Sequence, residues 1–169
     1  MQFEILYHDL AHGAEIIRTL TLGVTEVEAR FKPDPESWSI LEVLCHLYDE
    51  EREDFRLHLD TILHRPTEQW AVIDPENWVT ERGYNERDLG ETLDRFLAER
   101  DQSLDWLKSL PAPDWEAEYT DPYGSLKAGE MLASWAAHDI LHIRQLVELR
   151  YARIKKLADP FDIGYAGEW

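Results

Sequence analysis

Apolar residues recur at steps of three and four along four long stretches of the chain, which is the spacing of one buried face of an α-helix. The stretches cover about residues 3–20, 39–65, 88–110 and 127–151. Helices of roughly 20 residues are about 30 Å long, and such rods bury their apolar faces best against one another. Because the alternation typical of strands is almost absent, the sequence predicts an all-α protein built as a four-helix bundle.

Two helix starts carry a capping box, in which a hydroxyl and a glutamate three residues later bond each other's backbone N–H groups. Thr25 and Glu28 have this spacing after the first helix, and Ser39 and Glu42 have it at the start of the second. Trp38 precedes the second capping box, where it is expected to serve as a hydrophobic staple. These signals place the start of the second helix at Ser39.

The connection formed by residues 67–87 is much longer than the turns that usually join helices in a bundle. Connections of this length are often functional, and they permit a topology other than a simple up-and-down order. Residues 1–151 are expected to form the bundle. Residues 152–169 are expected to form an irregular C-terminal tail.

The chain is strongly acidic, with 35 Asp and Glu against 17 Lys and Arg and a formal net charge of −18. Nucleic acids and anionic membranes are bound by clustered cations, so both are disfavoured as partners. The single cysteine, Cys45, excludes an internal disulfide. No apolar run reaches the roughly 18 residues of a membrane span, and the N-terminus lacks a signal-peptide pattern. A soluble cytoplasmic protein is expected, with the acidic residues 49–54 as a solvated face.

Seven histidines include two pairs spaced four residues apart, His8 with His12 and His138 with His142. Residues four apart on a helix share a face, so the imidazoles of either pair could bind one metal ion. The first pair has polar neighbours and is expected at the surface. The second pair lies in the most apolar part of the last helix, where an imidazole needs a partner because burying an unpaired polar group costs free energy.

A third histidine, His46, lies between apolar residues on the second helix and could complete a set with His138 and His142. Three protein ligands leave a coordination position for water or substrate, which is the pattern of catalytic metal sites. Without a metal, the same residues would be ordinary buried histidines satisfied by hydrogen bonds. Both interpretations remain open at this point.

Three polar residues are candidates to orient these imidazoles. Glu50 lies one turn after the histidine of the second helix, and Asp139 and Gln145 lie on the last helix. Trp135 could line the site, although packing in the core is the preferred interpretation. A ferritin-like di-iron site is excluded because no histidine follows a glutamate by three residues. The sequence assigns no catalytic residue.

Two runs of residues together resemble the DinB-like superfamily. The first extends from Trp38 to Leu47 and is followed by Glu50, and the second extends from His138 to Gln145. Further matching positions lie between these two runs, and they are Tyr84, Asp88, Leu89, Phe96, Arg100 and Gly124. The resemblance covers nearly the whole chain, from the first helix to about residue 150.

The resemblance implies a bundle of up-down-down-up topology, in which residues 67–87 form the crossover between the second and third helices. It also implies a divalent metal, zinc or nickel, held by His46, His138 and His142, and a homodimer. Members with an assigned activity transfer low-molecular-weight thiols or isomerise thiol adducts, and the metal activates the thiolate.

The main hypothesis is therefore a metal-dependent enzyme that activates a thiol or water for transfer to, or hydrolysis of, a small electrophilic substrate. The alternative is a non-catalytic metal-binding bundle that acts in a stress response or as an interaction protein. A third possibility is a bundle without a metal, in which the three histidines are ordinary buried residues.

Overall fold

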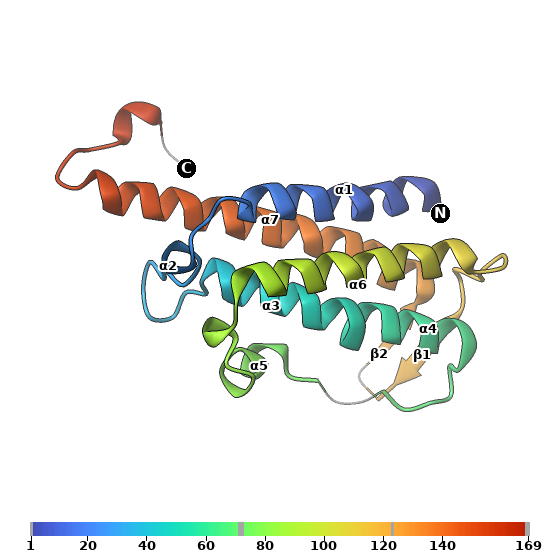
Figure 1. Cartoon of the computed structure of the whole chain (residues 1–169). Coiled ribbons are helices and arrows are strands. Elements are labelled where there is room, and N and C mark those ends of the chain that lie inside the picture. The colour runs from blue at the N-terminus through green and yellow to red at the C-terminus, as the bar shows by residue number, and fades with distance from the viewer. Residues whose placement is uncertain (1, 71–72, 123, 168–169) are drawn as a thin grey trace.

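The computed structural model describes residues 2–70, 73–122 and 124–167. Four long helical stretches lie side by side (Figure 1). They are α1 (Phe3–Thr21), the continuous run of α3 (Ile40–Glu50), η1 (Glu51–Phe55) and α4 (Arg56–His64), then α6 (Leu89–Ser109), and α7 (Ala128–Ala158). The predicted four-helix bundle is confirmed. None of the described helices is long and apolar enough to cross a membrane.

The helices follow an up-down-down-up order. In Figure 1, α1 and α7 run towards the left, whereas α3–α4 and α6 run towards the right. Helix α1 packs against α6 and α7, and α3 packs against the same two helices. The crossover from α4 to α6 returns along the length of the bundle and contains α5 (Pro75–Glu81) and η2 (Tyr84–Glu86). The long connection therefore forms the crossover that the up-down-down-up topology requires between the second and third long helices.

Both predicted capping boxes are present. Thr25 and Glu28 open the short helix α2 (Glu26–Ala29), and Ser39 and Glu42 open α3, with hydrogen bonds in both directions in each case. Because these side chains satisfy N–H groups that the helix itself leaves free, they fix where each helix begins.

Two local features differ from the prediction. A hairpin of β1 (Glu118–Asp121) and β2 (Gly124–Lys127) precedes α7, with Tyr119 opposite Leu126. Strands of four residues are too short to show a clear alternation. Helix α7 also continues to Ala158, beyond the predicted end at residue 151. Lysines in its last turn favour this extension because cations stabilise the C-terminal end of the helix dipole.

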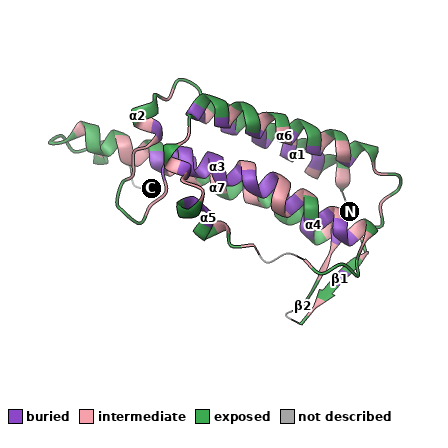
Figure 2. Ribbon diagram, turned by 60° about the horizontal axis from the view of Figure 1, so that its bottom comes forward, coloured by how far each residue is buried: buried purple, intermediate pink, exposed green. Residues whose placement is uncertain are grey.

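The buried residues form two apolar clusters. One gathers around α3 and the neighbouring parts of α1, α6 and α7, and the other gathers around α4, the start of α7 and the hairpin. Figure 2 shows buried positions on the faces by which the bundle helices contact one another, and exposed positions at the far end of α7. The core thus runs along the bundle between the helices. The buried polar side chains described below lie within it.

The acidic run of residues 49–54 is not the solvated face that the sequence suggested. Asp49, Glu50 and Glu51 are each at most 4% exposed. Residues 51–55 form a π-helical turn, which changes the faces that the following side chains occupy. The expectation was wrong because Arg82 and Arg100, from distant parts of the chain, pair with Asp49 and Glu51, and a local sequence pattern cannot show them.

Arg100 of α6 is the most deeply buried of these cations, with 1% of its surface exposed. Its guanidinium donates two hydrogen bonds of 2.8 Å to the carboxylate of Glu51 and two, of 2.6 and 2.9 Å, to that of Asp139. The indole N–H of Trp135 donates to the same Glu51 carboxylate at 3.0 Å. Burial disfavours the charge on Arg100, but the two carboxylates outweigh it and raise the pKa of the guanidinium.

Candidate metal site

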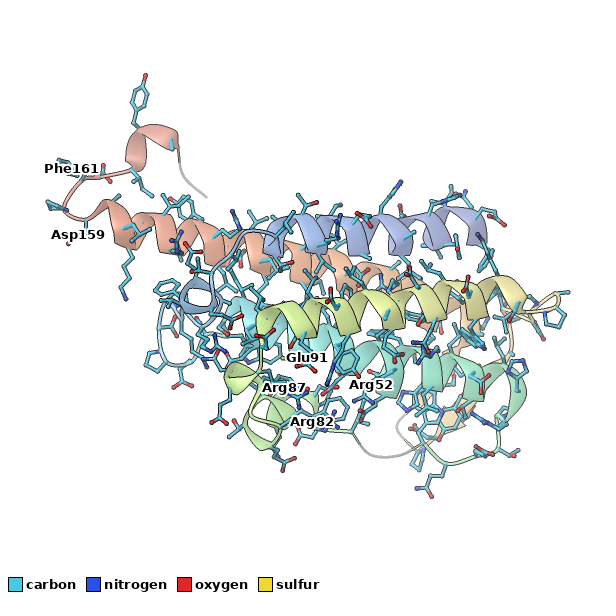
Figure 3. The ribbon with its side chains drawn as sticks, viewed as in Figure 1. Arg52, Arg82, Arg87, Glu91, Asp159 and Phe161 are labelled. Atoms are coloured by element: carbon cyan, nitrogen blue, oxygen red, sulfur yellow. The ribbon has the colours of Figure 1, made fainter. Side chains whose placement is uncertain are left out.

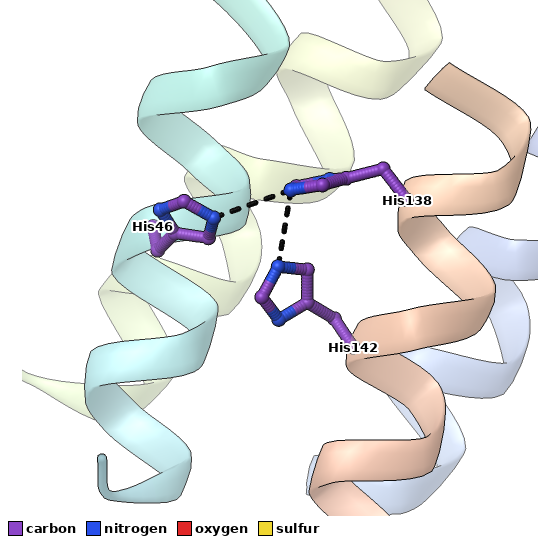
Figure 4. A group of neighbouring side chains, drawn as sticks. All are labelled: His46, His138 and His142. Carbon is purple, nitrogen blue, oxygen red and sulfur yellow. Dashed lines mark hydrogen bonds between the residues drawn. The ribbon is translucent and has the colours of Figure 1, made fainter. Parts of the chain in front are cut away.

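The three histidines singled out by the sequence meet between two antiparallel helices. His46 comes from α3, and His138 and His142 come from successive turns of α7 (Figure 4). Nε2 of His138 lies 3.3 Å from Nε2 of His46 and 3.1 Å from Nε2 of His142. The ligand atoms of all three lie within 4.8 Å of one another. This cluster is called the three-histidine site below.

The spacing of the nitrogens suits a metal ion. Imidazole nitrogens bind zinc at about 2.0–2.1 Å, so two ligands of a tetrahedral centre lie about 3.3 Å apart. The two measured separations are close to that value. Three neutral rings that bring their nitrogens together cannot all be satisfied by hydrogen bonds among themselves, whereas one cation can accept all three lone pairs.

Burial keeps the rings in the form that binds metals. Desolvation, with smaller contributions from the neighbouring histidines, lowers the pKa of His46 to about 2, and desolvation lowers that of His138 to about 3. Desolvation also lowers the pKa of His142, although its hydrogen bond to Gln145 opposes this. All three imidazoles are therefore neutral at pH 7, with lone pairs available to a cation.

Gln145 occupies the place predicted for an orienting residue. Nδ1 of His142 donates a hydrogen bond to its amide oxygen at 2.8 Å. This bond places the ring proton on Nδ1, so Nε2 carries the lone pair that faces the other two histidines.

Glu50 also lies beside the site, one turn after His46. Its Oε1 is 4.0 Å from Nδ1 of His46, and neither atom has a hydrogen-bond partner although both are buried. Burial, together with a hydrogen bond to Asp54, raises the pKa of Glu50 to about 9. Glu50 therefore lies next to the imidazole of His46 without a hydrogen bond between them.

Asp139 follows His138 directly, but its carboxylate lies with Arg100 on another side of α7. It acts in the buried ion network. Trp135 is buried in the core, as the preferred interpretation predicted, and its indole N–H belongs to the same network. The pair His8 and His12 lies on the exposed surface of α1, as expected.

Aromatic rings enclose the three-histidine site. The ring of Trp38 lies 4.9 Å from that of His46 and is parallel to that of His142 at 6.3 Å. Phe55 lies 4.9 Å from the ring of His138. Trp38 was predicted as a staple, and the structure places it at the site. Phe55 was not predicted because a regular α-helix would put it on the face opposite His46, and the π-helical turn shifts it.

An open groove of about 510 Å³ leads from the site to the surface. Its lining residues come from the connection before α3 and from α7, and they are Pro33, Glu36, Ser37, Trp38, His142, Gln145, Glu148, Leu149 and Ala152. This α7 groove would give a small molecule a route to the histidines.

Comparisons with known proteins bear on the fold and the family of this chain. No curated protein matches the chain. Among solved structures, YfiT from Bacillus subtilis superposes with a TM-score of 0.77 at 16% identity, over 89% of this chain and 86% of its own. It is described as a probable metal-dependent hydrolase with an unusual four-helix bundle topology. Residues 9–146 match the DinB superfamily, and because they make up most of the chain, the protein belongs to that family.

Proposed function

We propose that this protein is a metal-dependent enzyme whose three-histidine site holds one divalent cation, zinc or nickel. The observation that carries the proposal is the convergence of three neutral imidazole nitrogens beside an open groove. The resemblance in fold to YfiT, described as a probable metal-dependent hydrolase, supports the same class of reaction.

A divalent cation with three protein ligands would supply Lewis acidity and a position for the reacting group. The protein itself positions the ligands and covers part of the site with aromatic rings. Gln145 holds His142 in one tautomer through its 2.8 Å hydrogen bond. Trp38 and Phe55 cover the rings on two sides, which lowers the local dielectric and strengthens electrostatic interactions at the site.

The group activated at the site would be a small thiol or a water molecule. In thiol transfer, the S–H proton is lost to solvent, sulfur forms a bond to an electrophilic carbon, and the leaving group departs with the electron pair of its own bond. In hydrolysis, water takes the role of the thiol. A non-catalytic role would suit a closed site, so the groove at His142 favours an enzyme.

Cobalt substitution tests this proposal. Cobalt-loaded protein should develop strong near-ultraviolet absorption when a small thiol is added, because thiolate ligation produces charge transfer. Turnover of a fluorogenic alkyl halide with thiol, or of an activated ester with water, should require the metal. His142→Ala should abolish both signals, whereas His8→Ala, which changes an exposed histidine on α1, should leave them intact. Turnover that survives chelation and His142→Ala would contradict the proposal.

A further inference from the structure

The lining of the α7 groove contains acidic side chains. Two of its lining residues, Glu36 and Glu148, are acidic, and no lysine or arginine is among the described residues that line it. Glu36 lies on the connection before α3, and Glu148 lies on α7 two turns from His142. The two carboxylates therefore flank the approach to the three-histidine site from different elements.

The two acidic residues differ in their partners. Glu148 accepts a 2.7 Å hydrogen bond from Arg144 on the preceding turn of α7. Glu36 is exposed, and within the described part of the chain its carboxylate forms no ion pair. Among the groove residues, Glu36 is thus the charge most available to a ligand.

A turn holds Glu36 in place. The carboxylate of Asp34 accepts hydrogen bonds from the backbone N–H groups of Glu36 and Ser37, at 3.0 and 2.9 Å, and one of 2.6 Å from the Ser37 hydroxyl. The bond from the Ser37 hydroxyl, aided by the two backbone bonds, lowers the pKa of Asp34 against the opposing effect of desolvation. Because Asp34 is engaged within the turn, it fixes the backbone of Glu36 beside the groove.

The rest of the groove offers apolar and aromatic surface. Trp38, Leu149 and Ala152 line it together with Pro33. The face of a tryptophan ring attracts a cation, and apolar walls bind the hydrocarbon part of a ligand. An anionic ligand would meet the exposed carboxylate of Glu36, whereas the charge of Glu148 is already paired with Arg144.

We propose that the α7 groove selects a small amine that is positively charged and has an apolar or aromatic body. Its ammonium group would pair with Glu36, and its body would pack against Trp38, which places it next to His142. The identification of this amine as the substrate rests on the proposed function. The binding of the amine in the groove does not depend on that function.

A matched pair of probes tests the proposal. Phenethylamine and 3-phenylpropionate are similar in size and shape and opposite in charge. Binding of each to the full chain is followed by NMR through the indole N–H signal of Trp38, which a Trp38→Phe variant identifies among the seven tryptophans. The titrations are made with and without saturating zinc.

The amine should shift the Trp38 signal, and the carboxylate should shift it much less. Glu36→Gln should weaken amine binding about two- to five-fold, in keeping with one partly exposed ion pair. Glu36→Lys should reverse the preference of the groove. Asp101→Asn removes a carboxylate from the exposed surface of α6, so it controls for general attraction of cations to an acidic protein.

Equal binding of the two probes, or no shift of Trp38, would overturn the proposal. So would equal weakening by Glu36→Gln and Asp101→Asn, because the attraction would then be that of the whole acidic molecule. A preference for the amine in protein that binds no zinc would contradict the proposed function and leave the groove proposal intact.

Discussion

Single side chains decide whether three imidazoles can share one cation. Each ring must present Nε2, and the hydrogen bond at Nδ1 determines which nitrogen carries the proton. Gln145 provides that bond for His142, and Glu50 faces the corresponding atom of His46. Residues that touch no metal themselves are therefore expected to control its affinity.

Gln145→Leu should weaken zinc binding about 10- to 100-fold, because His142 loses the hydrogen bond that fixes its tautomer. Competition with a chromophoric chelator measures the change. Gln102→Leu is the matched control, since Gln102 is exposed on α6 and lies outside the site. An unchanged affinity in Gln145→Leu would show that the amide does not orient the ligand.

The buried ion network makes a separate prediction about stability. Arg100→Leu should lower the free energy of unfolding by about 3–5 kcal/mol, because Glu51 and Asp139 would remain buried without their cation. Arg95→Leu removes an exposed arginine that pairs with Glu91 and should cost at most about 1 kcal/mol. Urea denaturation of both variants measures the difference. Equal losses would mean that the buried network adds nothing beyond an exposed pair.

The sequence predicted which three histidines would lie together, but their surroundings only in part. The spacing of His138 and His142 in an apolar helix, with His46 in another, carried the prediction, and the structure brings these three together. Glu51 and Phe55 could not be placed from the sequence. Their positions depend on a π-helical turn and on Arg100, which lies 49 residues from Glu51.

Between elements, the close contact of α1 with α7 depends on a glycine. A Cβ atom on Gly13 would lie 2.5 Å from Oδ2 of Asp139. The carboxylate cannot easily move away because Arg100 holds both of its oxygens. The absence of a side chain at Gly13 therefore lets the two helices approach at the level of the buried ion network.

Gly13→Ala should destabilise the protein by about 1–3 kcal/mol through overpacking, although alanine is the better helix former. Gly90→Ala is the control. It lies in the first turn of α6, where a Cβ would meet only the Asp88 carboxylate at 3.4 Å, so it should be neutral or slightly stabilising. Thermal melts of the two variants give the comparison. A stabilised Gly13→Ala would refute the tight contact.

Helix starts were predictable because capping is local, as the boxes at Ser39 and Thr25 show. The hairpin before α7 could not be predicted, because its pairing depends on residues that face each other across two very short strands. Tyr119 of that hairpin also stacks on Trp70 of the crossover, at 4.2 Å between ring centroids. Such a contact between distant segments leaves no periodic signal in the sequence.

Across the whole molecule, ion pairs tie the crossover to the bundle. Asp49 of α3 accepts hydrogen bonds from Arg82 at 2.5 Å and from the Tyr84 hydroxyl at 2.6 Å. Arg52 adds a bond from the next turn. Figure 3 shows Arg52 and Arg82 on the side of the bundle that the crossover covers. Asp49 is thus the anchor that holds α5 and η2 against α3.

This anchor predicts a dependence of stability on pH. Burial tends to raise the pKa of Asp49, but the bonds from Tyr84, Arg52 and Arg82 outweigh burial and hold it below the ordinary value. Because the folded pKa is lowered, the stabilisation is full above the unfolded pKa of about 3.9 and is lost as the pH falls through the folded pKa.

Asp49→Asn should therefore destabilise the protein at pH 7, and its difference from wild type should shrink as the pH falls below about 4. Denaturant unfolding at a series of pH values follows the difference. Asp101→Asn, an exposed change on α6, serves as the control. A difference that stays constant or grows in acid would contradict the assignment of Asp49.

The order of the helices could not be deduced from the residues alone. Apolar periodicity predicted four long helices and their approximate extents, and residues 67–87 were long enough for a crossover, but neither fact selects a direction for each helix. That selection came from the resemblance to the DinB-like superfamily, and the structure confirms it (Figure 1).

The central claim is that His46, His138 and His142 together bind one divalent cation. Elemental analysis and zinc titration of the purified chain, beside single alanine variants of each histidine and the surface control His12→Ala, test it most directly. We predict one zinc or nickel ion for each wild-type and His12→Ala chain, and a large loss of affinity in each of the other three variants. Equal metal binding in all five proteins, or none in any of them, would contradict the claim.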